Sequence, residues 1–308
     1  MPEDTSLFWS ERAFNGERIR EYSREGGVNP RDFEKEIWAY DTLFILQKLS
    51  GMDLYFKGGT CVQTYLPLDH QRFSIDLDFN INTKDRSTNA ILGEIAELNR
   101  KLEDKDLLRE TSNNLTYGGI YPQYYDRNSG VITFARVFPS KTTSGPSKLV
   151  YRGNLVEKSE IEGIFNHILI QINLKHTLYA MQWNKDGIRL RIQKYEPYQK
   201  ELFFKRLSLS DLFVDKIMAL KNRREFRDLY DLGMMAKLEV DKDLCREKLD
   251  RILKPGEDIS ETEAIICSFM EGKEYLRYIH SLPKNVVPVI NDRTFYTGTI
   301  KLVKELLD

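Results

Sequence analysis

Residues 56–81 read FKGGTCVQTYLPLDHQRFSIDLDFNI, and this stretch decides the fold of the chain. Gly58 and Gly59 directly follow a short apolar run, and Asp76 and Asp78 interrupt a later apolar segment. The apolar run predicts a strand, TCVQTYL predicts a short helix that stops at the next proline, and SIDLDFNI predicts a second strand. The stretch therefore predicts a strand, a turn and a short helix, followed by a strand that carries two acids.

The second strand, expected over residues 74–81, sorts its side chains onto two faces because successive side chains of a strand alternate. Four apolar side chains are expected to enter the core: Ile75, Leu77, Phe79 and Ile81. Asp76, Asp78 and Asn80 are expected side by side on the other face. Neighbouring carboxylates repel each other and aspartate is a poor strand former, so a cation between the two aspartates would make them tolerable. Their oxygen atoms suit Mg²⁺ or Mn²⁺, which also bind substrate phosphates.

The two glycines complement that acidic pair. Gly58 and Gly59 have no Cβ atom, so a phosphate can approach the backbone closely. The helix that follows offers free N–H groups to an anion, and Thr60 adds a hydroxyl donor or a cap. An ordinary turn explains Gly-Gly alone, and a solvated edge strand explains Asp-x-Asp alone. Both together, in this order, favour a site where a metal ion meets a phosphate.

Composition excludes several classes of protein. The chain has 308 residues, 41% of them hydrophobic, and a formal net charge of −1 at pH 7, so any contact with nucleic acid must come from a local patch. The three cysteines and four histidines show no metal-ligand spacing, which predicts free thiols and no zinc site. The N-terminal segment lacks the apolar core of a signal peptide, and no apolar run approaches the roughly 20 residues of a membrane span. We expect a cytoplasmic protein with no membrane partner.

The pattern of predicted secondary structure changes near residues 200–207. Helical patterns at residues 33–50 and 86–109 alternate with strand-like segments before that point, and the chain is mostly helical after it. We expect two domains, an α/β domain of residues 1–205 and a helical domain of residues 206–308.

The helix expected over residues 208–223 carries a lysine on its apolar side. Lys216 falls on the same stripe as Leu209, Phe213 and Leu220. A lysine on an inward face is costly unless an anion such as a carboxylate or a nucleotide phosphate meets it. A lysine that packs its stem on the core and extends its amine to the edge explains the pattern equally well, so the pattern leaves both open.

Two further segments carry charge. The helix expected to begin at FRDLYDLGMM has Asp228 and Asp231 towards the flank of its packing face, where acids are usually only solvated. The segment KNRREFR before them is a basic turn that could hold a triphosphate or an RNA end. Residues 185–206 interleave basic and aromatic residues, which suits RNA, although a solvated strand pair with buried aromatic residues is the commoner cause of such a pattern.

Together these blocks resemble the polymerase-β-like nucleotidyltransferase superfamily and, more closely, the AbiEii/MenT toxin family. Members read K-G-G-T and then R-F-S-x-D-hydrophobic-D-F, and later D-K-x-x-A-L, a basic turn and R-D-x-x-D. The matching residues of the first block are Lys57, Gly58, Gly59, Thr60, Arg72, Phe73, Ser74, Asp76, Asp78 and Phe79. Those of the second block are Asp215, Lys216, Ala219, Leu220, Arg223, Arg224, Arg227, Asp228 and Asp231.

The resemblance implies an α/β fold of the α+β kind, with a polymerase-β-like core around a mixed sheet and a C-terminal helical bundle that contributes to the active site. It implies four catalytic residues, of which the first two bind the metal: Asp76, Asp78, Lys216 and Asp228. It also implies residues that bind the nucleotide: Lys57, Gly58, Gly59, Thr60, Arg72, Ser74, Arg223 and Arg227. Asp231 is the second choice for the later acid, because the R-D pair is the tighter match.

One departure from the superfamily concerns the third metal-binding carboxylate, which a later strand usually supplies. The best candidate strand, HILIQINLK, offers Gln171 and Asn173 instead of an acid. Either Asp228 or Asp231 replaces it, or two acids and the substrate hold the metal, or the site is partly degenerate. Asn173 is kept as a secondary site candidate.

The resemblance implies a Mg²⁺-dependent nucleotidyltransferase that transfers NMP from an NTP to an RNA, with the 3′ end of tRNA as the first candidate acceptor. It also implies a role as the toxin of a type IV toxin–antitoxin or phage-defence system, held in check by a cognate antitoxin protein. Two alternatives remain open. One is a kinase-like phosphotransferase acting on protein or RNA, and the other is a non-catalytic nucleotide-binding module, suggested by the missing strand acid.

Overall fold

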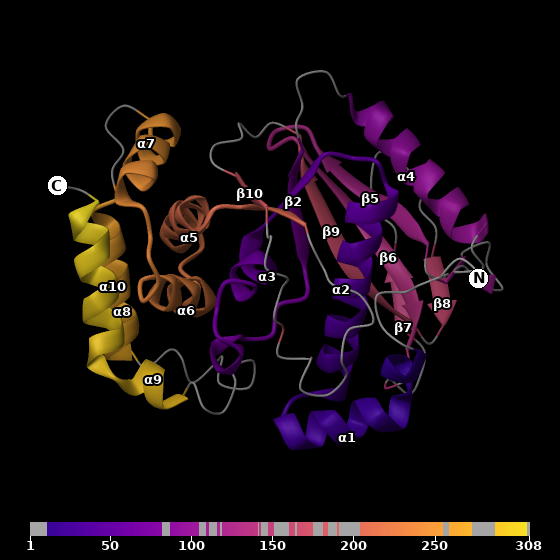
Figure 1. The fold of residues 1–308 in the computed structure, drawn as a ribbon, viewed down its shortest axis with the longest axis horizontal. Coiled ribbons are helices and arrows are strands. Elements are labelled where there is room, and N and C mark those ends of the chain that lie inside the picture. The colour runs from indigo at the N-terminus through magenta and orange to yellow at the C-terminus, as the bar shows by residue number, and fades with distance from the viewer. Residues whose placement is uncertain are drawn as a thin grey trace.

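The computed structural model combines an α/β part with a helical part, as the sequence predicts (Figure 1). It describes residues 11–81, 87–104, 109–110, 116–117, 119–140, 142, 147–150, 160–163, 165–174, 181–183, 190, 204–254, 259–272 and 287–306. Among these residues, no helix is long and apolar enough to cross a membrane.

A seven-stranded mixed sheet, in the order β10–β11–β1–β2–β9–β6–β5, is the largest sheet among the described strands. Its members are β1 (Leu54–Lys57), β2 (Leu77–Ile81), β5 (Ile120–Asp126), β6 (Val131–Pro139), β9 (Phe165–Asn173), β10 (Met181–Trp183) and β11 (Lys205–Leu207). β1 runs antiparallel to β2 and parallel to β11, and β2 runs parallel to β9. Two small pairs are β3 (Arg109–Glu110) with β4 (Thr116–Tyr117), and β7 (Ser147–Val150) with β8 (Glu160–Gly163).

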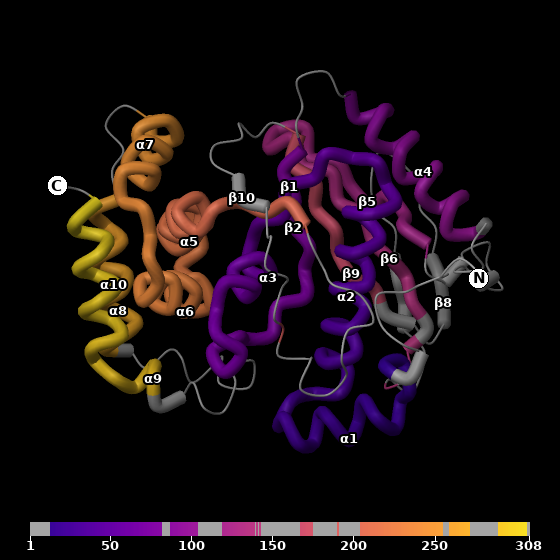
Figure 2. Tube along the Cα trace, in the orientation of Figure 1, coloured from indigo at the N-terminus to yellow at the C-terminus, as the bar shows by residue number. Residues whose placement is uncertain are grey.

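Helices cover the sheet and form the C-terminal part (Figures 1 and 2). Their bounds are α1 (Gly16–Gly26), α2 (Pro30–Leu49), α3 (Gly58–Gln63), α4 (Thr88–Asp104), α5 (Leu209–Arg223), α6 (Phe226–Met235), α7 (Lys242–Ile252), α8 (Glu261–Gly272), α9 (Val287–Asn291) and α10 (Arg293–Glu305). α5 starts at a serine cap, where the Ser208 side chain accepts from the Asp211 N–H, and ends at Arg224 in the left-handed conformation. The caps therefore fix both ends of the helix that carries Lys216.

The core extends from the α/β part into the helical part, and one portion of it lies between the sheet and α2. Phe56, Phe79 and Phe204 pack together in it, with ring centroids 5.5 and 5.2 Å from Phe56. A fully buried ion pair anchors the helix, with Arg136 Nη1 of β6 2.7 Å from Asp41 Oδ2 of α2. The opposite side of β2 therefore remains available for a site.

Two elements bring the α/β part and the helical part together. α3 packs against β1 and β2 on one side and against α5 and α6 on the other. Across the sheet, Lys57 of β1, Asp78 of β2 and Gln171 of β9 are direct neighbours in register. These three residues line one pocket with residues of α5, and Figure 2 shows α3 between the sheet and the pair α5 and α6.

The predicted strand over residues 74–81 is wrong at its start. β2 begins at Leu77, and Asp76 is an exposed residue in front of it. The cause is the Thr60 hydroxyl, which donates to the Asp76 carbonyl at 2.5 Å and ties this backbone to α3 rather than to a strand. Asn80, expected on the same face as the two aspartates, is fully buried.

The predicted helices agree only in part with the observed elements, and the predicted domain boundary falls inside a strand. The helices expected at residues 33–50 and 86–109 correspond to α2 and α4, but α4 ends at Asp104 and Arg109 belongs to β3. α1, β10 and β11 were not predicted, and α10 lies in the part that was expected to be helical. Most of residues 185–206, the basic and aromatic segment, lies outside the described residues. The division into domains at residue 205 stays a prediction, and that boundary falls inside β11, which pairs with β1.

Candidate functional site

The two glycines at the end of β1 leave room for the side chains of the site itself. Gly58 has φ +77°, a conformation that favours glycine, and a Cβ there would lie 2.1 Å from Asp78 Oδ2. A Cβ on Gly59 would lie 2.6 Å from an Arg72 guanidinium nitrogen. The glycines are therefore needed even without a phosphate, because the backbone passes directly beside an acid and a base.

The acidic side of the site consists of Asp76 and Asp78. Asp78 is half-buried on β2, and Asp76 is exposed just before it. The pKa of Asp78 lies above the ordinary aspartate value because burial, and then Asp76, disfavour its charge, although Lys57 acts in the opposite direction. Thr60 is buried below them, with its hydroxyl 2.9 Å from Ser74 Oγ. Thr60 therefore holds the backbone of the segment that leads from Ser74 to Asp76.

Two adjacent carboxylates with one raised pKa fit a divalent cation, which would offset their repulsion. Among the described residues, no group of three or more His, Cys, Asp or Glu is arranged to hold a metal. Asp228 and Asp231 pair with Lys216 and Arg72, and whether either completes a metal-binding set with Asp76 and Asp78 stays a prediction. Gln171, which is not an acid, stands at the strand position beside Asp78.

Lys216 of α5 is buried and meets carboxylates, which decides between the two explanations of its position. Its Nζ lies 2.9 Å from Asp228 Oδ1 and 2.7 Å from Asp231 Oδ2. Arg72 adds a bidentate contact, with Nε 2.8 Å from Asp231 Oδ1 and Nη2 2.6 Å from Asp231 Oδ2. Burial raises the pKa of Asp231, but Arg72 and Lys216 outweigh it and hold that pKa below the ordinary value.

The two acids of α6 were expected towards the flank of its packing face, where acids are usually only solvated, but these two have no contact with solvent. Asp228 and Asp231 are fully buried, because the cations around them replace the water that such acids need. Asp228 Oδ1 also receives Arg223 Nη2 at 2.9 Å, whereas Asp228 Oδ2 is buried without a hydrogen-bond partner in the described part of the chain. The acids hold Lys216 and Arg223 in place.

Gln63 of α3 is a residue of this network that sequence reasoning missed. Its Nε2 donates to Asp231 Oδ1 at 3.1 Å and to the Gly59 carbonyl at 3.1 Å, and its Oε1 accepts from the Arg72 N–H at 2.8 Å. It therefore connects the glycine turn, the segment before β2 and α6. The sequence did offer one indication of this role: Gln63 lies in the short helix between the K-G-G-T motif and the R-F-S-x-D motif.

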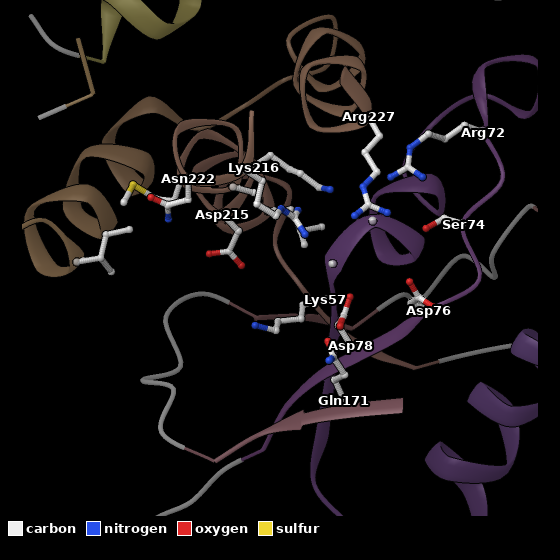
Figure 3. Close-up of a pocket in the computed structure, with 17 residues that line it drawn as sticks. Lys57, Arg72, Ser74, Asp76, Asp78, Gln171, Asp215, Lys216, Asn222 and Arg227 are labelled. Carbon is white, nitrogen blue, oxygen red and sulfur yellow. The ribbon is translucent and has the colours of Figure 1, made fainter. Parts of the chain in front are cut away.

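A pocket of about 500 Å³ opens between the acidic side and α5 (Figure 3). The predicted site residues that line it are Lys57, Gly58, Gly59, Arg72, Ser74, Asp76, Asp78, Lys216, Arg223 and Arg227. The pocket is also lined by two residues of the second motif block that had no predicted role, Asp215 and Ala219, and by Leu212, Met218, Asn222 and Ile252, which the sequence did not single out. Thr60, Asp228 and Asp231 lie behind the lining, and Asn173 is in register with Asn80 and outside the lining.

The lining has one acidic and one basic side. Figure 3 shows Asp76 and Asp78 on one side, with Lys216 and Arg227 across the pocket from them. We call the four cations of the lining that come from the helices and the R-F-S segment the basic wall: Arg72, Lys216, Arg223 and Arg227. Arg223 and Arg227 are partly exposed, and Arg227 pairs with Glu225 at 2.5 Å. A polyanion bound through a cation could contact both sides at once.

Comparisons with known proteins agree with this geometry. No individual curated protein matches the chain in sequence. A similar solved structure is MenT4, a nucleotidyltransferase toxin from Mycobacterium tuberculosis, with a TM-score of 0.52 at 14% identity over 96% of this chain and 90% of that chain. At that identity the likeness concerns the fold. The model of the AbiEii nucleotidyltransferase toxins matches residues 43–271, which include every element of the pocket, so the chain belongs to the AbiEii family of nucleotidyltransferase toxins of type IV toxin–antitoxin systems.

Proposed function

We propose that the protein transfers NMP from an NTP to the 3′ end of an RNA, most directly a tRNA, in a reaction that depends on Mg²⁺. The observation that carries the proposal is the pairing, in one pocket, of Asp76 and Asp78 with a basic wall. Phosphoryl-type transfer depends mainly on positioning and on neutralisation of charge, and this pocket offers both.

The acidic side would serve the metal and the acceptor. Asp76 and Asp78 would hold Mg²⁺, which when bound neutralises phosphate charge and favours ionisation of the attacking hydroxyl. Asp76 is exposed, so an RNA end can approach it from solvent. Asp78 Oδ2 lies where a side chain on Gly58 would otherwise be, so the glycine leaves room for this carboxylate at the pocket.

The basic wall would serve the triphosphate. Lys216 and Arg72 are held by Asp228 and Asp231, so their positive groups are oriented before a nucleotide binds. Such preorganisation favours the transition state because little rearrangement is needed when charge develops on the phosphates. In this scheme Asp228 and Asp231 act through the cations rather than on the substrate.

The acceptor and the biological setting rest on membership of the family. An AbiEii toxin has a cognate antitoxin, and we propose that this one is a protein that blocks the toxin in the cytoplasm, within a phage-defence or toxin–antitoxin locus. The exposed side of Asp76 fits an RNA acceptor, because the hydroxyl at a free 3′ end is the least hindered nucleophile of such a chain.

A kinase-like phosphotransferase could use the same pocket, and the label on the nucleotide separates the two reactions. Purified protein, total tRNA and Mg²⁺ are incubated with each of the four NTPs carrying either an α- or a γ-phosphate label. The proposal predicts α-label in tRNA, and none when periodate has oxidised the 3′ end. Transfer of γ-label would show a phosphotransferase instead.

A non-catalytic binding module is the other alternative, favoured by Gln171 at the strand position where an acid is usual. Asp76→Asn is the discriminating variant, since Asp76 is exposed and its loss should not disturb the fold. Asp243→Asn removes an acid from an α7 side chain that is 95% exposed and is the matched control. A module that binds NTP but labels nothing, in wild type as in Asp76→Asn, would contradict the proposal.

A further inference from the structure

We propose that the part of the pocket formed by α5 and α7 binds the base of the nucleotide, and that Asp215 selects bases carrying an amino group. This inference rests on the proposed function, because it assigns the nucleoside end of the same NTP. Three residues that the transfer reaction does not use carry it: Asp215, Asn222 and Lys248.

The position of the Asp215 carboxylate is fixed from behind. Lys248 of α7 is 2% exposed, and its Nζ lies 2.7 Å from Asp215 Oδ1. The same Nζ donates to the Asp211 carbonyl at 2.8 Å and lies 3.3 Å from Asp211 Oδ1. The Asp215 side chain is 29% exposed and lines the pocket. A buried lysine therefore holds an acid at the surface of a cavity.

A carboxylate at this place is unsuited to phosphate. It repels anions and can only accept hydrogen bonds when ionised, so its ligand must be a donor. Two of the cations that attract phosphate, Arg72 and Arg227, lie near Ser74 and away from Asp215 and Asn222 (Figure 3). The nucleotide is thereby oriented with its triphosphate at the basic wall and its nucleoside at Asp215.

The surroundings of Asp215 suit a base. Asn222 lies about two turns further along α5, on the same face of the helix, and its amide can both donate and accept. Met218, three residues after Asp215 on α5, and Ile252 of α7 also line the pocket, and both are half-buried. A flat apolar ring with polar edges matches such a lining, and a methionine sulfur favours contact with an aromatic ring.

The chemistry of the acceptor decides which bases fit. Adenine, cytosine and guanine carry an exocyclic amino group that can donate to a carboxylate, whereas uracil carries keto oxygens at the corresponding edge. A hydrogen bond to a charged group is worth about tenfold or more in affinity. The site should therefore prefer the amino-bearing member of each matched pair of nucleotides.

Asp215→Asn offers a sharp test because Lys248 determines how the amide must point. The ammonium of Lys248 can only donate, so the Asn carbonyl faces it and the Asn NH₂ faces the pocket. An acceptor in the pocket thus becomes a donor without a change in size. Asp250→Asn, an exposed acid on α7, is the matched control.

The experiment measures equilibrium binding, in Mg²⁺, of the pairs CTP and UTP, ATP and ITP, and GTP and ITP. We expect the wild type and Asp250→Asn to bind an amino-bearing nucleotide about tenfold or more tightly than its keto partner, or than ITP in the case of GTP. We expect Asp215→Asn to abolish or invert that ratio while its affinity for tripolyphosphate stays unchanged. An unchanged ratio in Asp215→Asn, or UTP as the tightest ligand of the wild type, would overturn the proposal.

Two further outcomes keep the inference separate from the proposed function. If Asp215→Asn loses only the preference for ribose over deoxyribose, the carboxylate contacts the sugar and the inference about the base is wrong. If the wild type distinguishes the bases as expected but adds no label to tRNA, the inference stands and the proposed transfer fails.

Discussion

At the scale of single residues, Gly58 shows most clearly how the backbone and the chemistry depend on each other. A Cβ there would meet the Asp78 carboxylate, and φ is +77°. We expect Gly58→Ala to displace Asp78 and to abolish nucleotide transfer. Gly51 is the matched control, because it has φ +73° and a Cβ added there would have nothing within 4 Å. Both alanines should cost about 1–2 kcal/mol of stability from the left-handed backbone.

Comparison of the two variants isolates the contact with Asp78. Denaturant unfolding gives the stability of each, and incorporation of α-labelled NTP into tRNA gives the activity. Equal activity in Gly58→Ala and Gly51→Ala would show that the position of Asp78 does not matter.

The lowered pKa of Asp231 leads us to expect that the stability of the fold depends on pH. Its pKa in the folded protein lies below the value in the unfolded chain, so the carboxylate stabilises the fold above about pH 4 and this contribution is lost as pH falls through the lower, folded pKa. We expect Asp231→Asn to lose about 3–5 kcal/mol at pH 7, because Arg72 and Lys216 would remain buried with less counter-charge.

The measurement is urea unfolding at pH 7, 4 and 3. The difference between wild type and Asp231→Asn should shrink as the solution becomes more acidic, whereas Asp243→Asn should follow the wild type throughout. A difference that stays constant over this range would contradict the assignment of a low pKa to Asp231.

At the scale of secondary-structure elements, α7 supports α5 through one side chain. Lys248→Met would leave Asp211 without its buried cation and Asp215 without its anchor. We expect a loss of about 3–5 kcal/mol of stability, since removing one partner leaves the other charge buried. Lys242→Met, at an α7 side chain that is 44% exposed, is the control and should change stability little. Thermal unfolding of both variants checks this, and equal melting temperatures would contradict it.

Sequence reasoning identified the elements whose pattern is local. The alternation of apolar residues located β2, and the stripe through Phe213 and Leu220 located α5. It did not predict that β2 starts only after Asp76. The reason is that the Thr60 hydroxyl, which binds the Asp76 carbonyl, belongs to another element. The short strand β11 was missed because three residues hold no periodicity.

The site followed the same rule. Motifs placed ten of its residues in one pocket, since each motif lies within a few residues of chain. The burial of Asp228 depends on Lys216, and that of Asp231 on Arg72, which is 159 residues away in sequence. No local pattern contains that partner. The position of the Asp215 carboxylate likewise depends on Lys248, which belongs to α7 and not to α5 itself.

At the scale of the whole molecule, the α/β part and the helical part share one polar network. Arg72 and Gln63 pair with Asp231 of α6, and the Tyr230 hydroxyl donates to the His70 carbonyl at 2.5 Å. Separating the two parts would leave these buried groups without partners, which is costly. We therefore expect the chain to unfold in one cooperative transition, although the sequence suggested two domains.

Urea unfolding followed by tryptophan fluorescence and by circular dichroism checks this expectation. The two signals should give one coincident transition. Two separate transitions, or a stable fragment of residues 1–205, would show that the parts fold independently.

The central claim is that the acidic side and the basic wall act as one catalytic unit. The most direct measurement is the rate of α-label transfer to tRNA by wild type, Asp76→Asn, Lys216→Met and the double variant. When residues act as a unit, removing one of them already removes the contribution of the others. We therefore predict that each single change lowers the rate at least about a hundredfold, and that the double variant is no slower than the slower single variant. A wild-type rate in Lys216→Met, or losses that multiply in the double variant, would contradict the account.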